Sequence, residues 1–171
     1  MTKEGITLTE LLDSRDRRRA RQQEWLAAMP GAALLVLTVV MPGSVKRSSL
    51  SLDIARAAVE EIRTRLADRM LRFETFDLPT GFEAFASIDA SPDHVKQAAC
   101  SIEDSHPLGR LFDIDVFAAD GTPLTRTQYG LPARRCIICG DDARACMRIR
   151  RHDYDELLNT IQLKVNDFYG R

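Results

Sequence analysis

The sequence predicts an α+β protein in which a mixed β-sheet is flanked by helices and followed by a small cysteine-bearing C-terminal element. Short β-branched or alternating runs indicate strands, longer segments with capped ends and a 3.6-residue apolar period indicate helices, and three of the four cysteines lie near the C-terminus. The strands expected to form the sheet are Ala33–Val40, Met70–Phe76, Leu111–Ala118 and Leu124–Tyr129.

The composition is that of an ordinary soluble globular protein. Of the 171 residues, 44% are hydrophobic and 29% are charged, which excludes fibrous and disordered classes. We expect one domain over residues 1–171, with residues 133–171 as the C-terminal Cys/His and helix element. The net charge of −1 gives no attraction to nucleic acid or to a membrane, so we expect neither as a partner. Unevenly spaced cysteines and the lack of a secretory signal at the start predict a cytoplasmic protein.

The first helix is expected to begin at Thr7 or Thr9 and to end before Pro30-Gly31. It contains a dense block of arginines between residues 15 and 21. Several side chains on neighbouring turns could converge on one anion such as a phosphate, namely Arg15, Arg18, Arg19 and Gln22. A solvated basic helix face explains the same pattern equally well.

The next segments alternate between strand and helix. The buried strand Ala33–Val40 leads into a loop with cations and turn residues, Met41–Ser48, which could hold phosphates or simply connect two elements. An Ala-rich apolar stripe predicts an amphipathic helix over Leu50–Asp68. Phe82–Ile88 is a further strand candidate, and Ser91-Pro92-Asp93 is a typical helix start.

Residues Leu111–Ala118 alternate in polarity, as side chains do along a pleated strand. The even positions are apolar and suit a core, whereas Asp113 and Asp115 share the other face. Their oxygens are expected about 6–7 Å apart, close enough to bind one divalent cation or a pair of them. Periodicity alone also fits a solvated sheet face.

Three residues just before this strand add to the candidate site. Gly109 offers a flexible backbone and Arg110 a fixed positive charge. His106 could act as a general base or as a hydrogen-bond donor to a phosphate. Two carboxylates for Mg²⁺ beside an arginine for phosphate oxygens are what phosphoryl or nucleotidyl transfer requires.

Beyond a hairpin signal at Ala119-Asp120-Gly121, the C-terminal part contains a cluster of soft ligands. Cys136, Cys139, Cys146 and His152 have the spacing C-x2-C-x6-C-x5-H, with Gly140 where a tight turn is needed. These side chains could close a tetrahedral structural Zn²⁺ site, and thiols packed as small apolar groups are the alternative. Asp153 is expected to cap a terminal helix.

The segment His106-Pro-Leu-Gly-Arg-Leu-Phe-Asp-Ile-Asp-Val116 resembles a known signature. It is similar to the Gly-Arg-Leu-aromatic-Asp-x-Asp-Val motif of the citrate lyase holo-acyl-carrier-protein synthases, the CitX family. Further motifs match in the same order: Ser14-Arg15-Asp16 with Arg18 and Arg21-Gln22, Pro42-Gly43 with Lys46, and Arg134-Arg135-Cys136 with the later Cys and His residues. Their joint occurrence is more specific than any one motif, although Phe73–Ile88 matches only loosely and no ligand is assigned to Gly81 or Glu83.

The resemblance implies a nucleotidyltransferase-like fold and a defined reaction. The prosthetic group 2'-(5''-triphosphoribosyl)-3'-dephospho-coenzyme A would be transferred to a serine of the acyl-carrier (gamma) subunit of citrate lyase, forming a phosphodiester and releasing pyrophosphate. The alternatives are the equivalent transferase for the malonate decarboxylase carrier and a non-catalytic zinc-knuckle binding module.

The resemblance also implies roles for individual residues. Asp113 and Asp115 would bind Mg²⁺, and an aspartate or His106 would take the serine proton. The phosphates and the rest of the donor would be bound by Arg110, Lys46, Arg15, Arg18, Gln22 and Gly109.

Overall fold

The computed structural model describes residues 5–171, so the first four residues of the segment considered for a secretory signal lie outside it. The helices are α1 (Leu8–Ala28), α2 (Ser49–Leu66), α3 (Pro92–Ser105), α4 (Ala143–Arg148) and α5 (Tyr154–Tyr169). The strands are β1 (Ala33–Val39), β2 (Met70–Leu78), β3 (Gly81–Ile88), β4 (Phe112–Phe117) and β5 (Pro123–Leu124). Short 3₁₀ turns cover Ala67–Arg69, Gly109–Leu111 and Arg126–Tyr129.

The strands form one sheet in the order β2-β3-β1-β4-β5. The α+β class is confirmed, but each pairing is antiparallel, where the sequence analysis predicts a mixed sheet. The reason lies in the connections: β2 follows β1 through a helix but does not pair with it, and the hairpin return β3 pairs with β1 instead. The sheet therefore gains no parallel neighbours.

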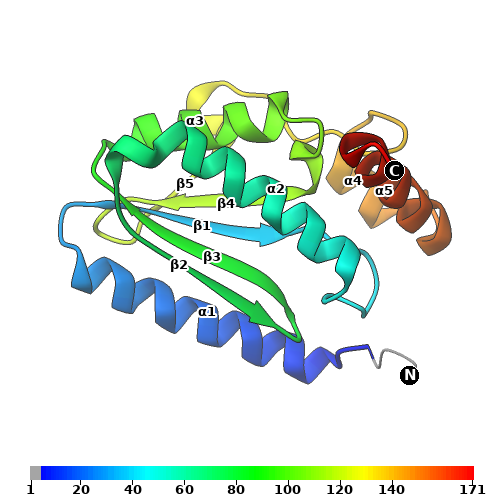
Figure 1. Cartoon of the computed structure of the whole chain (residues 1–171), viewed down its shortest axis with the longest axis horizontal. Helices are drawn as coiled ribbons and strands as arrows, with labels where there is room; N and C mark the ends of the chain where they lie inside the picture. Colours follow the sequence, from blue (N-terminus) through cyan, green and yellow to red (C-terminus); the bar gives the residue numbers. More distant parts are fainter. Residues whose placement is uncertain (1–4) are drawn as a thin grey trace.

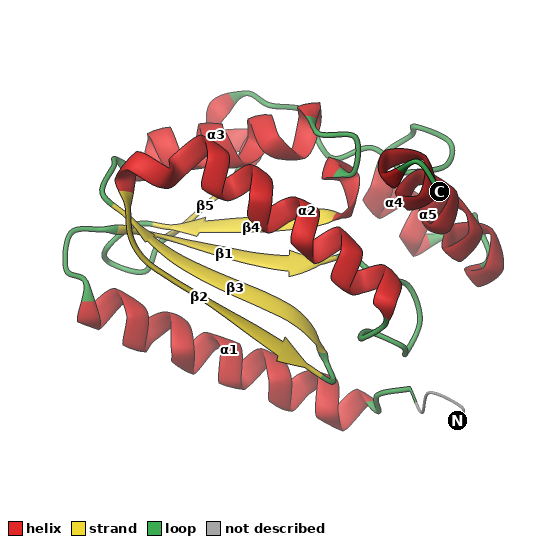
Figure 2. Ribbon diagram, viewed as in Figure 1, coloured by secondary structure: helices red, strands yellow, loops and turns green. Residues whose placement is uncertain are grey.

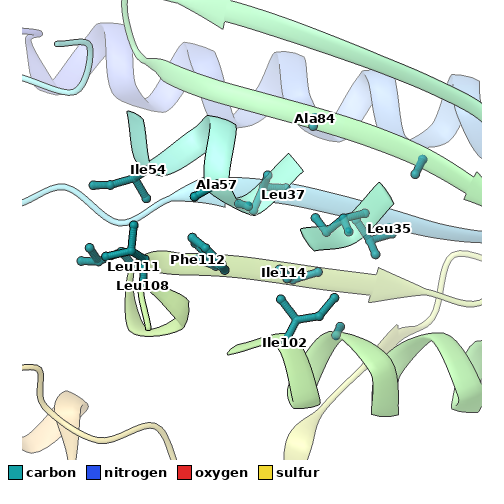
Figure 3. Packing of buried hydrophobic residues seen from close by; sticks show 14 of the residues in the cluster. Leu35, Leu37, Ile54, Ala57, Ala84, Ile102, Leu108, Leu111, Phe112 and Ile114 are labelled. Atoms are coloured by element: carbon teal, nitrogen blue, oxygen red, sulfur yellow. The ribbon is translucent and has the colours of Figure 1, made fainter. Parts of the chain in front are cut away.

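Helices α2 and α3 cover one face of the sheet, and α4 and α5 lie beyond the end at which β4 begins (Figure 1, Figure 2). Alternate residues of the three central strands meet these helices in the main core, as their 2-residue period requires. Figure 3 shows Leu35 and Leu37 of β1 and Ile114 of β4 among these packed side chains. The even positions of β4 are thus buried, as predicted.

Helix α1 covers the opposite face of the sheet (Figure 2). Trp25 of α1 packs there against Phe85 of β3, with ring centroids 5.6 Å apart, beside Leu34 and Val36 of β1. This second cluster is small and occupies only the part of the face near the end of α1. The remaining part of the same face is polar and positions the candidate site.

The predicted helix starts are confirmed by side-chain caps. Thr7 and Glu10 form a capping box at α1, and Ser48 caps α2. Ser91 caps α3 with proline in the first turn, and Asp153 caps α5.

The predicted strand Leu124–Tyr129 is wrong except at its first residue. Thr125 and Gln128 form a capping box, in which each side chain accepts a hydrogen bond from the backbone N–H of the other residue. The chain therefore forms a 3₁₀ helix after Leu124 instead of continuing as a strand. Beyond the short β5, the edge of β4 is satisfied by side chains of α3: Ile114 N donates to Glu103 Oε1 at 2.9 Å, and Lys96 Nζ donates to Ile114 O at 3.4 Å.

Among residues 5–171, no helix combines the length and the apolar character that crossing a membrane requires.

Candidate active site and metal cluster

The sheet register brings three polar side chains into one transverse row. Asp113 of β4 lies opposite Thr38 of β1, and Thr38 lies opposite Glu83 of β3. Residues directly opposite one another point to the same face, so all three point toward the side covered by α1. Asp115 follows in the next row, opposite Val36. The predicted pair of aspartates therefore belongs to a carboxylate face, which we define as Asp113, Asp115 and Glu83.

Asp113 is held on both of its carboxylate oxygens. Thr38 Oγ1 donates to Oδ2 at 3.4 Å, and Arg134 Nη1 lies 3.4 Å from Oδ1. Both contacts are long, so they orient the side chain without withdrawing it from further ligands. Asp113 thus combines a fixed position with partial exposure.

Asp115 is accessible to water, yet its pKa is raised. Burial is the main cause and the negative charge of Asp113 the second. The carboxylate of Asp115 touches water, yet enough protein surrounds it to disfavour its charged form. Two carboxylates that repel each other in such a place favour a bound cation.

Glu83 is a site residue to which the sequence analysis assigns no role. Its side chain is only 2% exposed, and it accepts from Arg18 Nε at 2.7 Å and from Arg21 Nη1 at 2.9 Å. The signal that could have found it is a single charged residue inside the apolar strand candidate Phe82–Ile88. Arg18, predicted to bind phosphate, is thereby fixed at the carboxylate face, and its charge acts on Asp115.

The predicted phosphate loop lies near the N-terminal half of α1. Lys46 Nζ donates to Met41 O at 2.5 Å, and burial, followed by the nearby charge of Arg15, lowers the pKa of Lys46. The β2–β3 turn is close to both elements: Ser14 of α1 donates to Thr80, and Gly81 lies near the Lys46 side chain. Two cations predicted for the donor, Arg15 and Lys46, thus come together at one end of the sheet.

The cysteine cluster assembles as its spacing predicts. The ligand atoms of Cys136, Cys139, Cys146 and His152 all lie within 4.8 Å of one another, and Gly140 makes the expected turn with a φ of 75°. His152 Nδ1 lies 3.2 Å from Glu156 Oε2, while the buried Nε2 has no hydrogen-bond partner in the described part of the chain.

This donor set fits a metal ion. Three sulfur atoms and a ring nitrogen suit tetrahedral coordination, and a carboxylate on the second nitrogen is a common support for a metal-bound histidine. A hydrogen bond from the Asp141 amide lowers the pKa of the Cys139 thiol. Burial acts to raise the pKa of Cys136, but hydrogen bonds from backbone amides outweigh it, so that this pKa is lowered too. Burial and then Cys139 raise the pKa of Cys146 to about 11. Two thiols are thus shifted toward the thiolate, the form that binds metal.

The sequence model of the family described as "Apo-citrate lyase phosphoribosyl-dephospho-CoA transferase" (CitX) matches residues 6–168. The chain belongs to the CitX family. Proteins with that name from Escherichia coli O6:K15:H31, Escherichia coli SMS-3-5 and Shigella boydii serotype 18 are each 38% identical to it over 166 residues. The aligned part covers 95% of this chain and 90% of each relative. The resemblance on which the sequence analysis relies is thereby confirmed.

A cavity lies near the C-terminal end of α1, and none of the three residues of the carboxylate face lines it. Its volume is about 460 Å³, and it lies between α1, through Arg19, Gln22 and Leu26, and the β4–β5 hairpin, through Phe117. Phe117 is two residues beyond Asp115 on the same face of β4. Gln22, predicted for the donor site, therefore lines a space that reaches β4 at Phe117, two residues beyond Asp115.

One residue of the CitX signature, His106, lies away from the carboxylate face. The His106 ring packs 4.8 Å from the Phe112 ring and 5.1 Å from the Phe168 ring, and burial lowers its pKa. Phe112 belongs to the main core, so His106 is on the sheet face opposite to Asp113. Burial, followed by the positive charge of Arg134, lowers the pKa of Arg110. The charges that act on Arg110 include those of Glu103 and of Cys136, a member of the Cys/His cluster.

Close packing explains why residue 109 of the CitX signature is a glycine. A Cβ atom there would lie 2.3 Å from Glu103 O, far inside van der Waals contact. The glycine lets the chain turn against the C-terminal end of α3 before β4 begins.

Proposed function

We propose that this protein transfers the phosphoribosyl-dephospho-CoA prosthetic group from its triphosphate donor to a serine of the acyl-carrier subunit of citrate lyase. The observation that supports this function most directly is the carboxylate face with cations at its border, in a chain that belongs to a family described by this transfer. The arrangement provides the two components of nucleotidyl transfer, ligands for a divalent cation and arginines for phosphate oxygens.

In this proposal Asp113 and Asp115 hold Mg²⁺, which when bound neutralises charge on the phosphates and on the departing pyrophosphate. The acceptor serine oxygen forms a bond to the α-phosphorus of the donor, and the bond from that phosphorus to the pyrophosphate oxygen breaks. Arg18, Arg15 and Lys46 bind phosphate oxygens on one side of the carboxylate face. The cavity beside Gln22 and Phe117 gives room for the nucleoside part of the donor.

The serine proton passes to an aspartate. Of the two bases that the sequence suggests, His106 and an aspartate, the aspartate is favoured because His106 lies on the opposite face of the sheet. A base must come within hydrogen-bond reach of the proton it takes, which a ring packed against Phe112 and Phe168 does not favour.

We also propose that residues 5–171 act as one transferase domain and that the metal in the Cys/His cluster is Zn²⁺, which prefers thiolate and imidazole ligands in tetrahedral geometry. In this proposal residues 133–171 support the transferase domain rather than form a separate binding module. Arg134, the side chains of α5 in the main core and the metal cluster connect the two parts.

The test is to incubate the protein with folded apo acyl-carrier subunit, the triphosphoribosyl donor and Mg²⁺, and to measure carrier mass and pyrophosphate. We expect the carrier to gain the prosthetic-group mass with equimolar pyrophosphate. Asp113→Asn and Asp115→Asn should each lower the rate at least about a hundredfold, while Asp155→Asn, an exposed carboxylate of α5, serves as the matched control. A folded carrier that gains no mass contradicts the proposal. Preferential modification of the malonate decarboxylase carrier would show that the protein is the equivalent transferase for that carrier instead.

A further inference from the structure

Arg134 connects the metal cluster to the carboxylate face. It lies two residues before Cys136, outside the regular elements, and its guanidinium reaches the start of β4. Nη2 donates to the carbonyl oxygens of Gly109 at 3.2 Å and Arg110 at 3.3 Å, and also to that of Phe112. Nη1 lies 3.4 Å from Asp113 Oδ1. One side chain thus holds the backbone that leads into β4 and contacts the carboxylate of the next residue, Asp113.

The backbone of Arg134 is fixed by the loop that bears the ligands. Its carbonyl oxygen accepts from Ala143 N at 2.9 Å, and Cys136 N donates to Asp141 O at 2.6 Å. On the other side of Cys136, Ile137 packs against the main core. A metal held by Cys136 and its partner ligands therefore tightens a loop that meets the sheet at two places, Arg134 and Ile137.

The guanidinium of Arg134 also lies 4.0 Å from Glu103 Oε1, but few buried apolar contacts hold the backbone segment that carries Arg134. Residues 131–133, just before Arg134, are exposed or only partly buried. Cys146 is buried, but the large apolar residues that follow it are not, since Met147 is 71% and Ile149 is 68% exposed. Arg134 Nε is itself buried without a hydrogen-bond partner in the described part of the chain, which is costly for a guanidinium. A side chain in such a position needs its surroundings to fix it.

We propose that the metal-bound Cys/His cluster fixes Arg134 as a positioning residue that orients Asp113 for cation binding. With Thr38 on one oxygen of Asp113 and Arg134 on the other, the carboxylate is oriented before the cation arrives. Removing the metal loosens the loop, moves Arg134 and leaves Asp113 free to rotate. The inference rests on the proposed function for the role of Asp113 as a cation ligand, and it assigns the cluster a part in the active site beyond stability.

The test measures the binding of Mn²⁺, a paramagnetic substitute for Mg²⁺, by electron paramagnetic resonance in zinc-loaded protein without donor or carrier. Asp113→Asn defines the Mn²⁺ signal that depends on this site, and zinc content is measured by elemental analysis after dialysis. The variants are Arg134→Ala, Arg134→Lys, Cys139→Ser and the double variant Arg134→Ala with Cys139→Ser. Arg148→Ala is the matched control, because it removes an exposed arginine of the same C-terminal part of the chain, residues 133–171.

We expect Arg134→Ala to retain zinc and to weaken Mn²⁺ binding about tenfold or more, and Arg148→Ala to change it by no more than about twofold. Arg134→Lys should give an intermediate loss, because an ammonium group can approach Asp113 but cannot bridge three carbonyl oxygens as a planar fork does. Cys139→Ser should lose zinc and weaken Mn²⁺ binding as Arg134→Ala does. The double variant should be no weaker than either single variant, because both changes act through one interaction.

Additive losses in the double variant, or a zinc-free Cys139→Ser that binds Mn²⁺ normally, would overturn the inference. So would wild-type protein with no Mn²⁺ binding that depends on Asp113. If Arg134 has only a structural role, its variants lower the unfolding temperature while Mn²⁺ affinity stays unchanged, which also overturns it. A failure to modify the carrier with these binding results intact counts against the proposed function alone.

Discussion

At the scale of single residues, the surroundings of Asp115 disfavour the ionised form of its carboxyl group. Burial and the neighbouring Asp113 raise its pKa, so the folded protein binds this proton more tightly than the unfolded chain does. A group of this kind contributes stability at pH values below its ordinary pKa, and this contribution is lost as the pH rises through the raised pKa. At neutral pH the ionised Asp115 therefore destabilises the fold, which is common for residues that serve a site.

Asp115→Asn is accordingly expected to increase the free energy of unfolding at pH 7 while it abolishes transfer. The amide carries no charge, so the repulsion from Asp113 disappears. Urea unfolding at pH 7 and near pH 4, about the ordinary pKa of aspartate, measures the effect, and the gain should shrink at the lower pH. An Asp115→Asn variant that is less stable than wild type at pH 7 would contradict the assignment of charge repulsion.

Residue-level reasoning from the sequence succeeded where one local pattern was sufficient. The alternation around Asp113 and Asp115 predicts a shared face, and the spacing of Cys136 to His152 predicts a cluster. Glu83 and His106 needed more, because the face to which each belongs depends on which strands pair and in what register. Such pairing is a property of distant segments that no single window contains.

At the scale of elements, α1 is attached to the sheet mainly through polar contacts at one end and aromatic contacts at the other. Its buried residues are Ser14 and Trp25, so apolar burial alone contributes little along most of its length. Between them, Arg18 and Arg21 converge on the buried Glu83. Arg18, one of the side chains predicted to bind a phosphate, thus also binds a carboxylate of the protein itself, and together with Arg21 this contact fixes the helix beside the carboxylate face.

Glu83→Gln is expected to lower the free energy of unfolding by about 2–3 kcal/mol, because two arginines lose a buried anionic partner. Both guanidinium groups are about a quarter exposed, which keeps the loss below that of a fully buried pair. Asp77→Asn, which breaks the exposed pair with Arg47, is the control and should cost less than about 1 kcal/mol. Urea unfolding of both variants decides the matter, and equal losses would show that Glu83 is not the anchor of α1.

At the scale of the whole molecule, the candidate site forms where five elements end or begin. The C-terminal end of β1, the starts of β3 and β4, the first half of α1 and the segment around α4 that carries the Cys/His cluster lie at one end of the sheet (Figure 1). Caps and periodicity predict most of these elements, because both signals are local. The strand order is not local: β1 pairs with β3 and β4, which are separated from it by one or two helices, and so the antiparallel sheet could not be predicted.

We expect the two parts of the C-terminal element to depend to different degrees on a metal in the Cys/His cluster. Helix α5 packs on the main core through Ile161 and Val165, and Tyr169 donates to Asp53 O at 2.8 Å, so its docking does not require the cluster. Residues 134–152 have few buried apolar side chains, chiefly Cys146 with the partly buried Ile137, so we expect their order to depend on a metal ion bound by the four clustered Cys and His side chains. The metal should therefore stabilise one segment and not the whole chain.

Removing the metal with a strong chelator is expected to lower hydrogen-exchange protection over residues 134–152 by at least about tenfold, because a structural zinc site contributes its binding energy to the order of its loop. Protection in α5 and in strands β1, β3 and β4 should stay within about twofold. Exchange measured by mass spectrometry with and without chelator gives both values in one experiment. Cys139→Ser is the control, since it lacks a ligand and should show the exposed pattern with or without chelator. Loss of protection throughout the sheet would mean instead that the metal holds the entire fold together, and Arg134 would then respond to global unfolding and not to its own loop.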